Sequence, residues 1–365
     1  MKFKRFLDKY FSPASRICIL LAVLSAVILF ISKMSEIFSD WFNRYVSSFC
    51  RLVISKVTGI LPFSLGEAVF LCLPLFVFIA LFIYVKVCNE DDVKAGRFTV
   101  SLVACLSLMF SSFVFMFGVA YNGSALETKL GLEAKDVTYD ELEHTANCLM
   151  EEIKAVIDEV DYVYDGSSTM PYSFKDLNNK LNDAYASFNK KHSFVPELRS
   201  NVKILAVSPI MTYTHISGIF TYYTGEANLN INYPDYSMPY TMAHEMAHQR
   251  GVAPENEANF VAFLVCLESD DPYIRYSASL SMLEYVLSAM RQASAEEYNR
   301  YISDMDLRIR GEMVAFSNFF DRYRDSVASS VTDTINDTYL KASGDTAGSQ
   351  SYGMVVDLAC AYFAD

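Results

Sequence analysis

The chain has 365 residues and is acidic, with 43 Asp and Glu against 30 Lys and Arg and a formal net charge of −13. This balance argues against a nucleic-acid-binding protein, because the backbone of DNA or RNA is itself negatively charged. Hydrophobic residues make up 52% of the chain, against roughly 45–50% in a soluble protein. The eight cysteines include no CxxC pair, so the sequence predicts no disulfide framework.

Three apolar runs without charge lie in the first third of the chain, at 17–32, 68–85 and 98–126. A helix needs roughly 20 apolar residues to cross a bilayer core of about 30 Å, and the second and third runs are long enough. The first run is slightly short, but Arg16 and Lys33 at its ends can extend to the headgroups. No small-residue cleavage site follows it, which favours an uncleaved anchor over a signal peptide. We predict three N-terminal transmembrane helices, at about 17–33, 68–86 and 98–121.

The segment between the first two runs has apolar residues at helical spacing and ends at a Pro-Phe-Ser turn, residues 62–64. A helix with one apolar side can lie flat at a membrane surface with that side in the lipid. We therefore predict an interfacial helix at about 34–58, on the outer surface of the membrane.

Basic residues predict the orientation of the three transmembrane helices. Residues 1–16 hold five Lys or Arg against one Asp, and such an excess marks the cytoplasmic side. Three crossings then place the loop 86–97 inside and everything after residue 121 outside. The charges agree, because residues 1–121 carry 12 basic and 7 acidic residues, a net +5, whereas residues 122–365 carry 18 and 36, a net −18. We expect a multi-pass membrane protein with a cytoplasmic N-terminus and an extracytoplasmic domain.

Residues 122–365 are expected to form an α+β domain that is mostly helical and contains a small β-sheet. Segments 202–209 and 216–233 are rich in β-forming residues, and Thr224-Gly225 predicts a turn within the second. The first predicted helix of this domain begins at a Thr138-x-x-Glu141 capping box, and a second covers about 173–191. A third begins near Ser237 with Pro239 in its first turn. Further helices are predicted at about 272–298, at 299–335 and, after a small-residue stretch at 342–353, at 354–363.

The most informative stretch is His244-Glu245-Met246-Ala247-His248, in a chain with only five histidines. Histidines at i and i+4 lie one turn apart on one helical face, so both imidazoles can bind a single metal ion. Glu245 lies about 100° round the helix, where its carboxylate can take a proton from a zinc-bound water. Zinc lowers the pKa of such a water to about 7. The motif predicts one catalytic Zn²⁺ per chain, with Glu245 as the general base.

A catalytic zinc has three protein ligands and one open position. Gly251 and Pro254 predict that the chain reverses after the motif and starts another helix nearby. Zincins take the third ligand after a glycine turn, or from a Glu on the next helix with an orienting residue four positions later. Both devices point to Glu255, with Asn259 in the orienting position, and Glu257 is the alternative. More distant candidates for the third ligand are His144, His192 and His215.

Further short segments match one known family: residues 61–67, 218–220, 224–230, 244–251, 255–260, 275–277, 336–341 and 351–353. On these segments the chain resembles, nearly end to end, the bacterial membrane family called domain of unknown function 3810. The resemblance implies a zincin-type zinc metallopeptidase in a bacterial cell membrane, without a known substrate. The Glu-x-Glu-Ala-Asn-Phe segment is also similar to one in soluble zinc peptidases that cleave transcriptional regulators.

An extended substrate of a zincin commonly pairs with an edge strand just before the metal helix, and residues 216–232 are placed for that role. Glu226 and Asn228 are either turn residues or cleft residues. A peptidase also needs a donor for the oxyanion that develops on the scissile carbonyl. The residues of suitable type are His215, Tyr222, Tyr223, Tyr240, Arg275 and Tyr276.

These features predict a membrane-anchored zinc metallopeptidase that acts on a peptide or protein substrate at the outer face of the lipid bilayer. Two alternatives stay open. One is a non-catalytic zinc-binding sensor or assembly factor, although a structural zinc has no use for the general base Glu245. The other is a zinc amidase that cleaves a cell-wall bond, which a wide cleft without an edge strand would favour.

Overall fold

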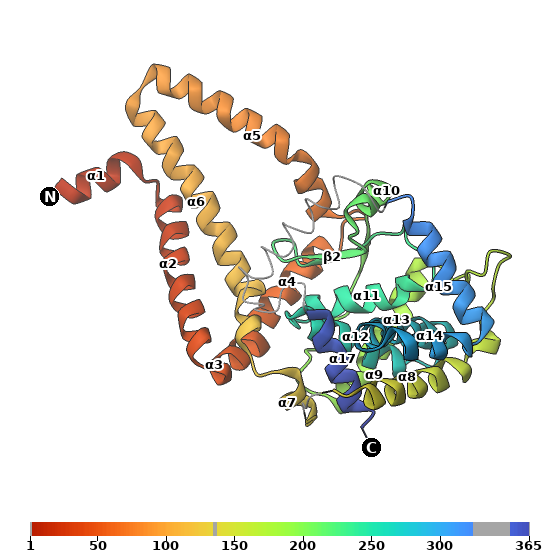
Figure 1. The fold of residues 1–365 in the computed structure, drawn as a ribbon. Coiled ribbons are helices and arrows are strands. Elements are labelled where there is room, and N and C mark those ends of the chain that lie inside the picture. The colour runs from red at the N-terminus through yellow and green to blue at the C-terminus, as the bar shows by residue number, and fades with distance from the viewer. Residues whose placement is uncertain (1, 134–136, 324–350, 365) are drawn as a thin grey trace. The chain divides into compact units, whose positions relative to one another are not determined.

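The computed structural model describes residues 2–133, 137–323 and 351–364. These residues are mostly helical, with one small mixed sheet, which confirms the expectation of a helical protein with few strands. The chain divides into two compact units, drawn as ribbons in Figure 1. The first unit comprises residues 1–123 and 221–226, and the second comprises residues 124–220 and 227–365.

Three helices of the first unit are long and apolar enough to cross a membrane: α2 (Pro13–Met34), α5 (Leu65–Glu90) and α6 (Asp92–Met116). They confirm the three apolar spans expected near the N-terminus, and a short helix, α1 (Lys2–Tyr10), precedes them. Each begins earlier than its apolar run, because Ser12, Ser64 or Asp91 accepts a hydrogen bond from a backbone N–H of the first turn. α6 ends before residue 121, where the chain continues as the 3-10 turn η2 (Gly118–Asn122).

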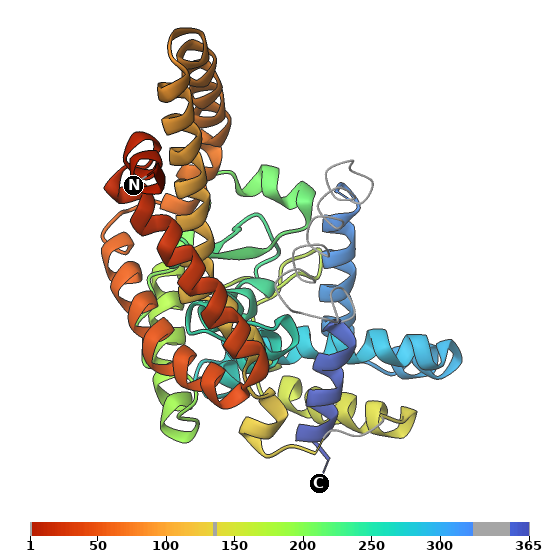
Figure 2. The same cartoon turned by 90° about the vertical axis from the view of Figure 1, so that its left-hand side faces the viewer.

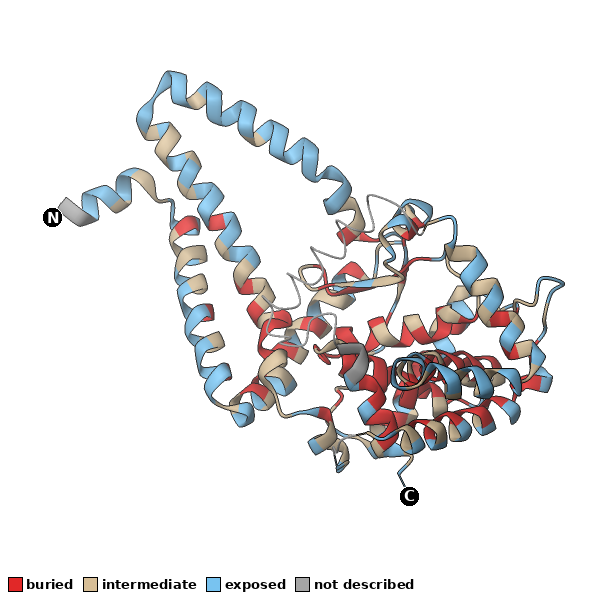
Figure 3. Cartoon of the chain, in the orientation of Figure 1, coloured by how far each residue is buried: buried red, intermediate tan, exposed pale blue. Residues whose placement is uncertain are grey.

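Helices α2 and α6 lie side by side in Figures 1 and 2. Both bury small polar residues, namely Ser25, Ser32 and Ser111. Each hydroxyl donates to a carbonyl in the preceding turn of its own helix, which satisfies the group in apolar surroundings. The apolar side chains of α5 are instead exposed along almost the whole helix (Figure 3), as expected of a helix surrounded by lipid.

The segment between α2 and α5 is helical, but it is not the single regular helix expected at 34–58. Ser35 ends α2 and caps a new helix. The helical path then passes through a π-helical turn before it becomes α-helical again. The three consecutive elements are α3 (Glu36–Trp41), η1 (Phe42–Ser47) and α4 (Ser48–Thr58).

Two buried charges of the first unit lie at the ends of its long helices. Arg51 donates to the carbonyl of Met116, at the C-terminus of α6, over 2.6 Å. The Glu226 carboxylate accepts from the backbone N–H groups of Leu65 and Gly66, at the N-terminus of α5, over 3.2 and 2.9 Å. Each helix end thus meets the charge that its dipole favours. Glu226, expected in a turn or a cleft, lies beside the turn and caps α5.

The sheet has the strand order β1 (Lys203–Ile204), β3 (Glu226–Leu229), β2 (Gly218–Thr221). β1 is parallel to β3, with Lys203 opposite Asn228, and β2 lies at one edge. Both predicted strands were too long. The first is cut short by a helical turn, α10 (Ser208–Met211), which has a proline at its start. The second is divided by a turn in which Gly225 has a left-handed φ of 65°.

In the second unit, helices surround α12 (Glu255–Leu267). Residues 258–266 of α12 are buried on every side, as expected of a central helix. Its packing partners are the helices α9, α11, α13 and α17. In the described part of this unit, the α-helices besides α10 and α12 are α7 (Leu126–Leu130), α8 (Tyr139–Lys154), α9 (Phe174–Lys191), α11 (Ser237–Gln249), α13 (Pro272–Ala293), α14 (Ala295–Ser303), α15 (Leu307–Phe320) and α17 (Ser351–Tyr362).

Two predicted helices have different bounds in the structure. The helix expected at about 272–298 ends at Ala293, because Ser294 caps α14 by accepting from a backbone N–H of its first turn. The helix expected at 299–335 is interrupted after Ser303, and α15 begins anew under an Asp306 cap. The remainder of that helix, the 336–341 segment and most of the 342–353 stretch lie outside the described residues.

We expect Glu226→Gln to lower the free energy of unfolding by about 1–2 kcal/mol, because the amide keeps the shape of the side chain but removes its charge from the N-terminus of α5. Thermal unfolding of the full chain in detergent measures this change. Glu133→Gln, at an exposed position, is the matched control and should leave the midpoint unchanged. Equal midpoints for the two variants would contradict the capping role.

Candidate metal centre

Helix α11 presents His244 and His248 on one face, with ring centroids 4.5 Å apart. The helix begins with a proline in its first turn, as predicted, and most of its residues are buried. The side chains of His244 and His248 are only 13% and 6% exposed, so packing holds both rings in place. Two imidazole nitrogens are therefore oriented before any ligand arrives.

The chain reverses direction directly after α11. Gly251 adopts a left-handed conformation with φ 91°, which a glycine reaches without strain. Pro254 then occupies the N-cap position of α12, whose first residue is Glu255. This reversal places the Glu255 carboxylate 3.2 Å from Nε2 of His244 and 3.4 Å from Nε2 of His248.

Hydrogen bonding fixes the protonated nitrogen of His248. Its Nδ1 lies 2.7 Å from the carbonyl oxygen of Val252, and because a carbonyl can only accept, Nδ1 carries a proton. In a neutral imidazole the lone pair is then on Nε2, which faces Glu255. Two acceptors facing each other repel, and a proton or a metal cation between them makes the contact favourable.

The donor set fits zinc in type, spacing and charge. Two ligands at about 2.0–2.1 Å from a tetrahedral ion lie roughly 3.3 Å from each other. Nε2 of His244 lies 3.2 Å from Oε2 of Glu255 and Nε2 of His248 lies 3.4 Å from Oε1, and one ligand atom from each of the three residues lies within 4.8 Å of the others. Two neutral imidazoles and one carboxylate offset half of a 2+ charge. The Glu255 side chain is 32% exposed, so the group of three side chains is accessible to solvent at this carboxylate.

The pKa values of the three side chains are set by two opposing effects, burial and the charges of their neighbours. Burial opposes charge on Glu255, but the imidazoles of His248 and His244 hold the pKa of its carboxyl well below the usual range. Burial also opposes charge on His248, yet Glu255 raises the pKa of that imidazole to about 9. Burial and the neighbouring His248 lower the pKa of His244. The centre thus favours a positive charge between His248 and Glu255, and a metal ion competes with a proton for that place.

Glu245 lies beside the histidines and is 4% exposed. Burial raises the pKa of its carboxyl to about 8; His248 lowers this pKa and Glu255 raises it. Its Oε2 is buried and has no hydrogen-bond partner among the described residues. A buried carboxylate oxygen normally meets a donor, so this atom can accept a hydrogen bond from a water molecule at the centre.

The other carboxylate oxygen of Glu245 lies against the backbone of Gly218 in β2. A Cβ at position 218 would be 2.6 Å from Oε1 of Glu245, so any side chain there would displace the carboxylate. Sequence reasoning assigned Gly218 no role. A glycine within a strand is a signal of close backbone approach, but it does not tell which group approaches.

Asn259 and Glu257 leave α12 in different directions. Asn259 raises the pKa of His244, but Nδ1 of His244 has no hydrogen-bond partner among the described residues, so the orienting contact expected of Asn259 stays a prediction. Glu257 instead accepts through Oε1 from the backbone N–H of Leu126, at the start of α7, over 3.0 Å. Residues two apart on a helix point about 200° from each other, which accounts for the difference. The structure therefore places Glu255, and not Glu257, with the histidines.

The other predicted cleft residues have partners other than the histidines. These partners are the Ile219 carbonyl for Asn228, Glu152 for Arg275, Glu312 for Tyr276, the Phe113 ring for Tyr222, the Gly66 carbonyl for Tyr223 and the Asn259 carbonyl for Tyr240. His215 has a positive φ of 57° and its Nε2 lies 3.2 Å from the Tyr323 carbonyl. Among the described residues, one group of side chains could hold a metal, and it consists of His244, His248 and Glu255.

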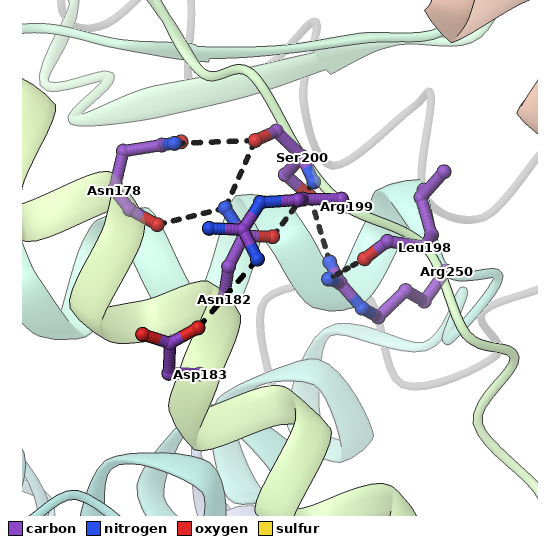
Figure 4. A network of polar contacts seen from close by, with 7 residues as sticks. All are labelled: Asn178, Asn182, Asp183, Leu198, Arg199, Ser200 and Arg250. Atoms are coloured by element: carbon purple, nitrogen blue, oxygen red, sulfur yellow. Dashed lines mark hydrogen bonds and ion pairs between the residues drawn. The ribbon is translucent and has the colours of Figure 1, made fainter.

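A buried network supports the C-terminal end of α11 (Figure 4). Nη1 of Arg250 donates to Oγ of Ser200 over 2.8 Å and to the carbonyl of Met246 over 3.0 Å. Nη2 donates to the carbonyl of Leu198. The guanidinium also lies over the ring of Tyr185, 3.8 Å from its centroid. This buried cation was missed from the sequence, because arginine is most often exposed.

Helix α9 completes this support. Asn182 accepts from the backbone N–H of Ser200 over 2.8 Å and donates to its carbonyl over 2.9 Å (Figure 4). The Tyr185 hydroxyl donates to the carbonyl of Ala243, the residue before His244, over 2.7 Å. The same helix therefore holds the segment that contacts Arg250 and the turn that carries the first histidine.

Comparison with known proteins identifies a family. The model of the family described as "Protein of unknown function (DUF3810)" matches residues 42–360, which include His244, His248 and Glu255. No curated protein and no solved structure matches the chain. The match covers most of the chain, and the protein therefore belongs to the DUF3810 family.

Proposed function

We propose that this protein is a membrane-anchored zinc metallopeptidase. The supporting observation is the group formed by His244, His248 and Glu255, with the buried carboxylate of Glu245 beside it. The three grouped side chains would hold one Zn²⁺, which when bound polarises a carbonyl and lowers the pKa of water to about 7. The remaining position would be open to solvent and substrate.

The chain's own residues would then handle the proton. Oε2 of Glu245 accepts a proton from the attacking water and can return it to the leaving amine. Burial raises the pKa of this carboxyl, and a bound cation beside it would favour the carboxylate form that accepts the proton. The carbonyl of Val252 would keep the imidazole of His248 oriented during this exchange.

The edge strand β2 favours a peptide substrate over the other substrates that zinc enzymes hydrolyse. β2 has β3 as its one strand neighbour among the described residues, so a polypeptide can pair along its other side. Gly218 of β2 is in contact with Glu245, and a paired chain would thus pass the general base. A cell-wall amide would make no use of that strand.

A buried carboxylate beside the ligands also favours catalysis over a purely structural zinc. Structural zinc sites use four protein ligands, whereas this group supplies three. We further propose that the second unit faces the outside of a bacterial cell, because the N-terminal segment is basic and three candidate spans follow it.

We expect the full chain, purified in detergent and loaded with zinc, to hold about one Zn²⁺ per chain and His244→Ala to lose it. Glu255→Gln should weaken zinc affinity, whereas Glu257→Gln should not, because Glu257 caps α7. Chelator competition titrations measure the three affinities. A loss of zinc affinity in Glu257→Gln with none in Glu255→Gln would assign the third ligand to Glu257. Full zinc in His244→Ala would exclude this metal site.

We expect Glu245→Gln to keep its zinc but to lose turnover by at least about 10²-fold, the usual contribution of a positioned general base. Cleavage of a peptide library, read by mass spectrometry, measures turnover. Gly218→Ala should also keep zinc and lose activity, since its Cβ would displace the Glu245 carboxylate. Gly311→Ala, whose Cβ would meet Gly166 at 3.4 Å, is the matched control. Full activity in Glu245→Gln would refute the peptidase.

Orientation is testable by cysteine labelling in intact cells, in a background without the eight native cysteines. We expect Tyr164→Cys, fully exposed in the second unit, to react with a membrane-impermeant maleimide. Asp92→Cys, at the first residue of α6, should react only after the membrane is permeabilised. The reverse pattern would place the metal centre in the cytoplasm.

A further inference from the structure

A row of exposed apolar side chains runs along α3, η1 and α4. The residues are four positions apart, and each is about half exposed or more. We call this row the apolar stripe; it consists of Ile37 (84% exposed), Trp41 (52%), Tyr45 (59%), Phe49 (65%), Val53 (45%) and Val57 (64%). Six large apolar residues at one spacing form a continuous surface and not scattered exposed side chains.

The opposite side of the same helical segment is buried within the first unit. Its buried residues are Ser39, Phe42, Ser47, Arg51 and Thr58, each at most 6% exposed. The Ser39 hydroxyl donates to the carbonyl of Val119, and the ring of Phe42 packs on that of Phe115. These contacts fix the rotation of the segment about its own axis, so the stripe points away from the unit.

The π-helical turn keeps the stripe on that side. Residues four apart on an α-helix differ by about 40° in direction, so five such steps would carry the row roughly 200° round the helix. A π-helical turn accommodates an extra residue, which turns part of this drift back. η1 lies within the stripe, between Trp41 and Val53. The π-helical turn thus helps to keep the six side chains of the stripe on one side of the segment.

The position of the segment in the chain indicates what covers the stripe. It starts two residues after α2 ends and stops shortly before α5 begins, and both of these helices are candidate membrane spans. The segment is therefore tied at both ends to the same side of the bilayer. Aromatic residues at the centre of a surface helix, here Trp41, Tyr45 and Phe49, are typical of the boundary between headgroups and acyl chains.

The charges beside the stripe indicate the kind of lipid. Two acids, Glu36 and Asp40, are matched by two bases, Arg44 and Lys56, so the segment has no basic excess outside the buried Arg51. A helix that relied on anionic lipid would carry a basic face. Attraction to the bilayer must therefore come from apolar area.

We propose that the apolar stripe is a lipid-binding surface that lies in the plane of the membrane. It inserts at the boundary between headgroups and acyl chains of the leaflet where α2 ends and α5 begins, and it requires no anionic lipid. This attachment is additional to the three spans and does not depend on the metal centre.

The sequence offers a native probe, because Trp41 in the stripe is the only tryptophan of the chain. The full chain is reconstituted in phosphatidylcholine vesicles that contain lipid with a doxyl quencher at carbon 5 or at carbon 16. We expect the larger loss of tryptophan fluorescence with the shallow label at carbon 5. Addition of phosphatidylglycerol, or of salt, should leave the ratio of quenching by the two labels unchanged.

Two variants in a Trp41→Phe background calibrate the depth. Phe78→Trp, near the middle of α5, should be quenched most by the label at carbon 16. Tyr164→Trp, fully exposed in the second unit, should be quenched by neither label. If Trp41, like the tryptophan of Tyr164→Trp, is quenched by neither label, the proposal is overturned, because water or protein would then cover the stripe. Stronger quenching of Trp41 by the label at carbon 16, as expected for Phe78→Trp, would overturn it as well. Quenching of Trp41 only in the presence of anionic lipid would also do so.

Discussion

The Glu255 carboxylate, held between Nε2 of His244 and Nε2 of His248, is the contact on which the arrangement of the second unit depends. A charge at the edge of a core is stable only when opposite charge or donors meet it. Because both histidines come from one turn of α11, the carboxylate must return to them through a short loop. Gly251 makes this reversal in a left-handed conformation, and Pro254 starts α12. The direction of α12, and with it the centre of the core, follows from that loop.

Charged side chains at several other places in the chain are satisfied by helix ends. Glu226 meets the N-terminus of α5 and Glu257 that of α7, whereas Arg51 meets the C-terminus of α6 and Arg250 that of α11. In each case the sign of the charge is the one that the helix dipole favours. Glu255 differs, because its partners are two imidazoles, and Nε2 of His248 faces it either with a proton or, in the neutral ring, with a lone pair. A proton or a metal cation is the natural complement of this group, and a metal site here agrees with the histidine spacing.

Much of the candidate site could be predicted from local sequence, because its geometry is local. The i, i+4 spacing places His244 and His248 on one face, and helical geometry separates Glu255 from Glu257 by about 200°. The roles of the remaining residues depend on distant partners. Nothing near Arg275 in the sequence indicates its ion pair with Glu152, and nothing near Gly218 indicates the approach of Glu245. Residue type alone therefore suggested a cleft role for Arg275 and none for Gly218.

The fold shows the same division between local and distant information. Hydropathy located the three spans, but their first turns extend into polar sequence because capping depends on single residues such as Ser64. The segment 34–58 was correctly expected to be helical from its periodicity, yet its π-helical turn leaves no clear mark on that pattern. Periodicity identifies residues that share a face, such as Trp41 and Phe49. Which side of such a helix faces protein depends on distant contacts, and here Phe42 and Arg51 turn their side toward the first unit. The position of the segment between two candidate spans is what favours lipid for the other side.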